Sequence, residues 1–83
     1  MYYKIKIDKR QELQEGRTLQ YLAQKCKYSR QYLTDTFNGK VKITRECVIN
    51  ILKGAADDSL KLAVKLSSEG LENTINYFFE KVE

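Results

Sequence analysis

The chain has 83 residues, of which 42% are hydrophobic, and a formal net charge of +4. This length suits one small domain rather than two, and this apolar fraction suits a packed core rather than a disordered chain. No apolar run reaches the roughly 20 residues that span a bilayer, and charged side chains interrupt the N-terminal segment, so we expect a cytoplasmic protein without a membrane partner.

The composition also argues against an enzyme or a metalloprotein. The chain contains no histidine, so an ordinary general base is missing, and no carboxylate pair has a recognisable catalytic setting. There is no glycine-rich phosphate-binding loop, and the two cysteines, Cys26 and Cys47, lack metal-ligand spacing. We therefore expect no catalytic activity, no metal and no cofactor, and we expect both cysteines to be buried as small hydrophobic side chains.

Charge is distributed unevenly along the chain. Residues 1–45 carry eleven basic and four acidic side chains, a net charge of +7, whereas residues 46–83 carry four basic and seven acidic ones, a net charge of −3. Within residues 17–45, Asp35 is the single acidic residue against seven basic ones. This asymmetry favours a polyanionic partner, and nucleic acid is the simplest one.

The first residues have the pattern of a β-strand. From residue 3 to residue 8, apolar and charged side chains alternate, so that Ile5 and Ile7 would face a core while Lys4 and Lys6 face water. A single strand needs a partner, which we expect either in another subunit or in the C-terminal region. The alternative interpretation is that this segment begins a first helix. In either case, we expect a short helix over 9–15, capped by Asp8 and ended by Gly16.

Residues 18–39 predict two short helices joined by a tight turn. The hydroxyl groups of Thr18 and Ser29 can cap the two helices, and Asn38-Gly39 can end the second one. Apolar side chains recur at helical spacing on one side of each helix, namely Leu19, Leu22, Ala23, Cys26, Leu33 and Phe37. The outward side of the second helix then carries Arg30, Gln31 and Thr34. This is the layout of a helix-turn-helix that reads DNA.

The second half of the chain predicts further helices. Thr44 can cap a fourth helix over 45–53, which Gly54 ends, and Asp57-Asp58 can cap a fifth over 59–68. The apolar stripe of the fifth helix is expected to comprise Leu60, Ala63 and Val64, flanked by Leu62 and Leu66.

A last helix is predicted over 71–82, with a long apolar stripe made of Leu71, Ile75, Phe78, Phe79 and Val82. Either this stripe completes the core, or it forms the interface of a homodimer, to which the region 59–83 would then contribute. The predicted fold is mainly α, a single domain over 1–83 with five to six helices and, if the first residues form a strand, one short N-terminal strand.

Residues Thr18 to Gly39 resemble the helix-turn-helix of phage lambda repressor-like proteins, the Cro/repressor or XRE type. The shared features are Leu22-Ala23 in the first helix, Ser29-Arg30 at the start of the second, and Phe37-Asn38-Gly39-Lys40 at its end. Thr44 and the apolar helix that follows it fit the fourth helix of the family, so the resemblance covers about residues 18–54. The chain departs from the family in its turn, where Lys27 replaces a frequent glycine, and in its first helix, which lacks the longer amphipathic pattern.

The resemblance implies a sequence-specific, double-stranded DNA-binding transcriptional regulator, a homodimeric repressor of phage or mobile-element type. In such proteins the second helix of the motif enters the major groove. Carried over to this sequence, the base-reading residues are Arg30, Gln31 and Thr34, with arginine suited to guanine and glutamine to adenine. The residues expected to contact the DNA backbone are Gln20, Tyr32, Asn38, Lys40, Lys42 and Arg45. For Tyr32, packing on the domain is an equal alternative.

A second hypothesis assigns the same motif to a different class of function. A helix-turn-helix protein can bind another protein and block it, as an antirepressor, an antitoxin or a phage-encoded inhibitor of a host system would. The aromatic pairs Tyr2-Tyr3 and Phe78-Phe79 leave room for this hypothesis, because aromatic side chains are enriched in protein interfaces.

Overall fold

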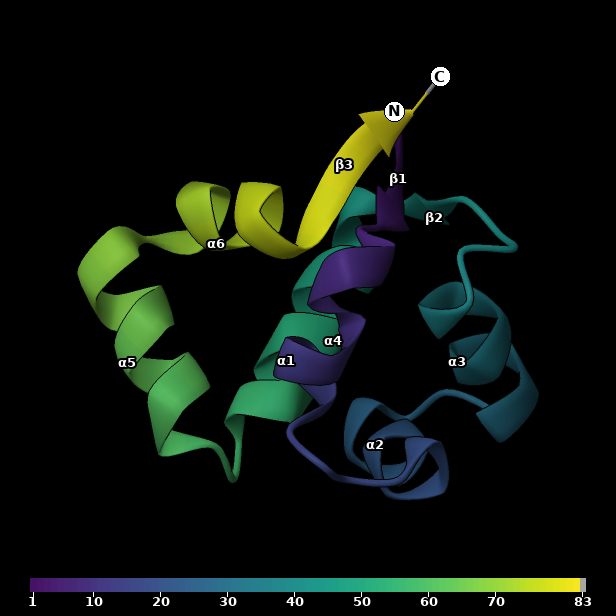
Figure 1. The fold of residues 1–83 in the computed structure, drawn as a ribbon, viewed down its shortest axis with the longest axis horizontal. Helices are drawn as coiled ribbons and strands as arrows, with labels where there is room; N and C mark the ends of the chain where they lie inside the picture. The colour runs from purple at the N-terminus through teal and green to yellow at the C-terminus, as the bar shows by residue number, and fades with distance from the viewer. Residues whose placement is uncertain (83) are drawn as a thin grey trace.

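A computed structural model describes residues 1–82 (Figure 1). Over these residues the chain forms, in order, β1 (Tyr2–Ile5), the 3-10 helix η1 (Ile7–Lys9), α1 (Arg10–Gln14), α2 (Leu19–Cys26), α3 (Arg30–Phe37), β2 (Ile43–Thr44), α4 (Arg45–Ala56), α5 (Leu60–Glu69), α6 (Leu71–Phe78) and β3 (Phe79–Val82). The mainly helical fold predicted from the sequence is confirmed. In the described part of the chain, no helix combines the length and the apolar character needed to cross a membrane.

The N-terminal strand is the central strand of a small antiparallel sheet with the order β2-β1-β3. The predicted strand is thus confirmed, and its main partner is the C-terminal region of the same chain. Tyr3 and Ile5 are buried against the helices. The prediction that Ile7 faces the core is wrong. The strand ends at Ile5, and Ile7 begins η1 and is 54% exposed.

Three of the predicted helix caps are present. The hydroxyl oxygens of Thr18, Ser29 and Thr44 accept the backbone N–H groups of the residues three positions later, at 3.1, 3.1 and 3.3 Å. Each cap satisfies an N–H group that the helix itself cannot pair. Since all three caps depend on local sequence only, they could be predicted without knowledge of the tertiary structure.

The two predictions of aspartate caps are wrong. Asp8 lies inside η1, and α1 follows Lys9 without a side-chain cap. Helix α5 is capped by Ser59, whose Oγ accepts the N–H of Leu62 at 3.1 Å. Asp57 and Asp58 instead form ion pairs with basic side chains of the N-terminal half.

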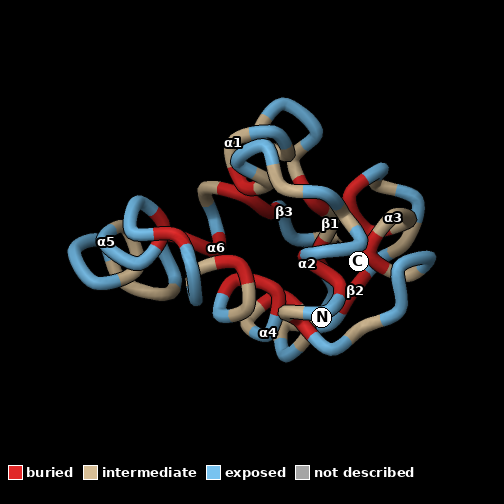
Figure 2. Tube along the Cα trace, turned by 90° about the horizontal axis from the view of Figure 1, so that it is seen from below, coloured by how far each residue is buried: buried red, intermediate tan, exposed pale blue. Residues whose placement is uncertain are grey.

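Helix α5 presents a different face to the core from the one predicted. Leu62 is buried and Leu66 is half-buried, whereas Leu60 and Val64 are 81% and 53% exposed and Ala63 is also exposed. The reason is that α5 lies at one end of the molecule, where only one narrow side of it contacts α4 and α6 (Figure 2).

Gly54 does not end the fourth helix, because α4 continues to Ala56. A Cβ atom at Gly54 would lie 2.7 Å from Cys26 Sγ and 3.1 Å from the carbonyl oxygen of Lys25, which are both on α2. α2 and α4 therefore lie close together at Gly54, and its missing side chain permits that approach.

The last predicted helix is also corrected. α6 ends at Phe78, and residues 79–82 form β3, which pairs with β1 along its whole length. Ile75, Phe78 and Phe79 are buried in the core, while Leu71 and Val82 are half-buried. The apolar stripe thus completes the core. The predicted dimer interface is wrong for these three buried side chains, because they present no surface to a second subunit.

Candidate nucleic-acid interface

Helices α2 and α3 form a helix pair around a small shared core. Leu22 and Cys26 of α2 and Leu33 and Phe37 of α3 are buried, as the apolar spacing predicts. The turn between the helices contains Lys27 with a φ of 62° and a ψ of 37°, in the left-handed region. Glycine adopts this conformation at the lowest cost, which gives a physical reason for the glycine that resembling proteins often have there.

Helix α3 lies at the side of the molecule, away from α5 (Figure 1). Arg30 and Gln31 are exposed, whereas Thr34 is half-buried. The Gln31 Nε2 atom donates a hydrogen bond to Asp35 Oδ1 at 3.0 Å. Asp35, which is half-buried, therefore lies beside Gln31, one turn further along α3. Asp35 was not among the residues predicted for the site, although its spacing of four residues from Gln31 was a usable signal.

The expected backbone-contact residues differ in how exposed they are. Gln20, Asn38 and Lys40 are exposed, and the Asn38 Oδ1 atom accepts a hydrogen bond from Arg10 Nη1 at 2.8 Å. Lys42 is exposed, and its Nζ lies 5.7 Å from the centroid of the Tyr2 ring.

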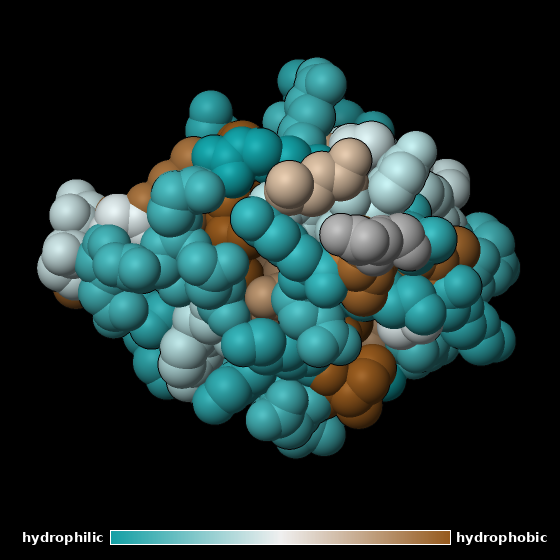
Figure 3. All heavy atoms as spheres, turned by 90° about the horizontal axis from the view of Figure 1, so that it is seen from above, coloured by the Kyte–Doolittle hydropathy of each residue, from teal (hydrophilic) through white to brown (hydrophobic). Residues whose placement is uncertain are grey.

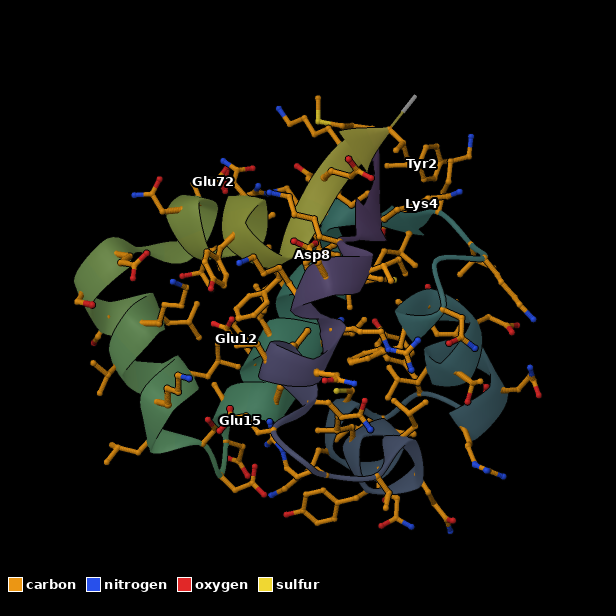
Figure 4. All side chains as sticks on the ribbon, in the orientation of Figure 1. Tyr2, Lys4, Asp8, Glu12, Glu15 and Glu72 are labelled. Atoms are coloured by element: carbon orange, nitrogen blue, oxygen red, sulfur yellow. The ribbon has the colours of Figure 1, made fainter. Side chains whose placement is uncertain are left out.

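Two further candidates are engaged within the fold. Arg45 is half-buried and binds Glu72 through two nitrogens, at 2.9 and 2.5 Å, which lowers the pKa of the Glu72 carboxyl (Figure 4). Tyr32 is half-buried, and its ring centroid lies 5.1 Å from that of Tyr28. Burial raises the pKa of the Tyr32 hydroxyl well above its usual value. For Tyr32, packing on the domain is thus the alternative that the structure shows.

Part of the charge asymmetry of the sequence is neutralised inside the molecule. Three ion pairs join a basic residue of 17–45 to an acidic residue of the C-terminal half, namely Arg17–Asp58 at 2.5 Å, Lys25–Asp57 at 2.5 Å and Arg45–Glu72 at 2.5 Å. Arg17 also donates to the carbonyl oxygens of Leu13, Gln14 and Ala55, so it holds α1 and α4 together.

Part of the basic charge that remains lies around α3. Within residues 1–82, no carboxylate lies within ion-pair distance of Lys27, Arg30 or Lys40. Lys27 precedes α3, Arg30 is in its first turn, and Lys40 follows its last turn. Together they place uncompensated positive charge at both ends of the helix, as a helix that approaches phosphates requires.

The two cysteines have different environments, and both are free thiols. Cys26 is buried, and burial raises the pKa of its thiol to about 11. The expected burial is wrong for Cys47, which is half-buried. The pKa of its thiol is lowered, because hydrogen bonds with Thr44, Tyr28 and Tyr32 outweigh the opposite effect of burial. In the part of the chain that the structure describes, no group of three or more histidine, cysteine, aspartate or glutamate side chains could hold a metal ion.

No family model, no curated protein and no solved structure matches the chain.

Proposed function

We propose that the chain is a sequence-specific, double-stranded DNA-binding transcriptional regulator that reads the major groove with α3. The observation that carries the proposal is the arrangement at α3: Arg30 and Gln31 are exposed on it, and Lys27 and Lys40 flank it without an acidic partner in residues 1–82. Arginine binds guanine through two hydrogen bonds and glutamine binds adenine likewise, while lysines neutralise the phosphates beside them.

The resemblance to lambda repressor-like proteins supports a narrower proposal, a repressor of phage or mobile-element type that acts in the cytoplasm as a homodimer. Two recognition helices of such a dimer would lie about 34 Å apart, one turn of DNA, and would read a two-fold-related operator. Because Ile75, Phe78 and Phe79 fill the core, a dimer would need a different surface. A measured molecular mass in solution tests this part of the proposal.

Selection of bound duplexes from a random pool, followed by binding measurements at several salt concentrations, tests DNA binding. We expect Arg30→Ala to cost about 1–3 kcal/mol on the selected site and to relax its sequence preference. Lys40→Ala should weaken binding to all sequences and reduce the salt dependence by about one phosphate contact. Lys61→Ala, an exposed residue of α5, serves as the control for loss of one positive charge. A wild-type protein without salt-dependent affinity for any duplex would contradict the proposal.

The second hypothesis, a protein-binding inhibitor, has less support. Of the aromatic residues that motivated it, Tyr3, Phe78 and Phe79 belong to the core, and Tyr2 alone is exposed. The exposed apolar side chains that such a partner could contact include Leu60 and Val64 on α5. Capture from a host lysate treated with nuclease separates the two hypotheses, since a DNA-binding protein should lose its partners under that treatment.

A further inference from the structure

We propose that two copies of the chain bind each other through the outer face of α5. This face carries four exposed side chains, Leu60, Ala63, Val64 and Ser67, which we call the α5 stripe. The inference rests on the homodimer of the proposed function and assigns an interface to it. The apolar side chains at the end of α6 and the start of β3 do not provide that interface, because they are buried in the core.

The α5 stripe follows one side of the helix. Its residues are at positions i, i+3, i+4 and i+7, which lie on a common face. The opposite face is directed to the core through Leu62, which is buried. On the stripe itself, Leu60 is 81% exposed and Val64 is 53% exposed. Helix α5 thus has two apolar faces, of which the fold covers one.

The α5 stripe is uncharged, although α5 contains charged residues on its other sides. Lys65 pairs with Glu69 at 3.0 Å, and its Nζ lies 3.8 Å from the centroid of the Tyr77 ring of α6. Figure 3 agrees with this arrangement, since near-neutral side chains, drawn in white, reach the surface at the end of the molecule where α5 lies. In a two-fold dimer the residues near the axis lie close to their own copies, so charges there would repel each other. An uncharged centre therefore suits a second copy of the chain.

The order of side-chain sizes along the α5 stripe fits an antiparallel pair. With a two-fold axis between residues 63 and 64, Leu60 lies opposite Ser67 of the partner subunit, and Val64 lies opposite Ala63 of the partner subunit. Each level then joins one large and one small side chain, which lets the two helices approach closely without leaving a void. A parallel pair would place Leu60 against Leu60 of the partner subunit and would lose this fit.

The position of α5 leaves the proposed DNA-binding helix accessible in both subunits. Helix α5 lies at the end of the molecule away from α3 (Figure 1). With ten residues it is about 15 Å long, so two such helices bury less than the roughly 1,200 Å² of a stable interface. We therefore expect a weak dimer in solution. Two adjacent half-sites on one duplex should strengthen it, because they raise the effective concentration of the subunits.

Sedimentation equilibrium over a series of protein concentrations tests the inference. The mean mass of the wild type should rise from that of a monomer toward that of a dimer. Leu60→Glu should raise the dissociation constant of the dimer by about 100-fold, because each dimer would bury two carboxylates at a cost of about tenfold each. Since Leu60 is 81% exposed in the monomer, this variant should keep its fold, which circular dichroism checks.

A second substitution tests the antiparallel register. Leu60→Glu combined with Ser67→Lys in the same chain places an ammonium group opposite each new carboxylate of the partner subunit. This double variant should bring the dissociation constant back to within about tenfold of the wild-type value. Gln24→Glu is the matched control, since it adds one carboxylate at an exposed position of α2, and it should dimerise as the wild type does.

The outcomes separate this inference from the proposed function. If the wild type binds a duplex but stays a monomer at every concentration, DNA binding stands and the inference is overturned, which leaves α5 to a different protein partner. If Leu60→Glu dimerises as well as Gln24→Glu, the dimer uses another surface and the inference is overturned as well. A double variant that stays monomeric excludes the antiparallel register. If the wild type dimerises through α5 but binds no duplex, the interface stands and the proposed function fails.

Discussion

Asp35 is a carboxylate of α3, the helix that is proposed to read DNA, where phosphates and base acceptors would repel it. Its hydrogen bond to Gln31 Nε2, at 3.0 Å, gives it a role there, because the bond fixes which way the glutamine amide points. An amide with a fixed donor and acceptor distinguishes bases better than one that can flip. A residue that lowers affinity can thus raise specificity.

We expect Asp35→Asn to bind unrelated duplexes more tightly than the wild type, because one negative charge is removed. In Asp35→Ala, which removes the acceptor of the Gln31 hydrogen bond, discrimination at the base that Gln31 reads should fall by about 1 kcal/mol, the lower end of the value of one bidentate contact. Competition binding with single-base variants of the selected duplex measures both effects. Asp8→Asn, an exposed residue outside α3, is the control for the charge alone. Unchanged discrimination in Asp35→Ala would argue that Gln31 needs no positioning.

Among the helices, α2 and α4 cross closely at Gly54. In an ordinary exposed helix, replacing glycine by alanine stabilises the protein by about 1 kcal/mol. Here the new methyl group would meet Cys26 Sγ at 2.7 Å and the backbone of Lys25 at 3.1 Å. We therefore expect Gly54→Ala to lower the free energy of unfolding by about 1–3 kcal/mol, as overpacking does. Urea unfolding measures the change.

A double variant shows whether the crossing itself is responsible. Gly54→Ala combined with Cys26→Ala should recover part of the loss, because the sulfur atom is removed while the Lys25 carbonyl stays in place. Lys53→Ala, an exposed position one residue earlier on α4, should change stability little. A stabilised Gly54→Ala variant would show that α2 can move away from α4 at no cost.

Across the whole molecule, the basic N-terminal half and the acidic C-terminal residues attract each other. Asp58 is the clearest case, since the Tyr21 hydroxyl and the Arg17 guanidinium hold the pKa of its carboxyl below the usual value. A carboxyl whose pKa is lower in the folded chain stabilises the fold above its unfolded pKa, about 3.9. That contribution is lost as the pH falls through the folded value.

We therefore expect the thermal unfolding midpoint of the wild type to decrease as the pH is lowered from about 5 to about 3, since that range spans the unfolded pKa of an aspartate. Asp58→Asn should be less stable at pH 7 and should lose less stability on acidification. Thermal unfolding at a series of pH values provides the test, with Asp8→Asn as the control that should keep the wild-type profile. Parallel curves for Asp58→Asn and the wild type would exclude a role of Asp58 in acid sensitivity.

The sequence predicted the features that depend on neighbouring residues. The caps at Thr18, Ser29 and Thr44 and the strand around Tyr3 follow from local hydrogen bonding and from local periodicity. The exposure of Arg30 and Gln31 could be predicted in the same way, because one face of α3 has to be buried.

Features that depend on tertiary contacts could not be predicted in this way. Gly54 has the local pattern of a helix end, yet it lies at the crossing of α2 and α4. There it faces Cys26, which is 28 residues away in sequence. Phe79 continues an apolar helical stripe, and only its pairing with Ile5 makes it a strand residue. From the sequence alone, Arg17 is expected to be a surface charge, because nothing in its local sequence indicates that Asp58 lies beside it.

The central position of β1 has a consequence for the order in which the molecule is built. β1 is synthesised before the helices, but its longer partner, β3, follows all of them, and the two strands lie side by side (Figure 1). Closing so long a loop is entropically costly, whereas α2 and α3 need only contacts close in sequence. On a ribosome, the helix pair can therefore form early, whereas β1 cannot pair with β3 until Phe79 has left the ribosome.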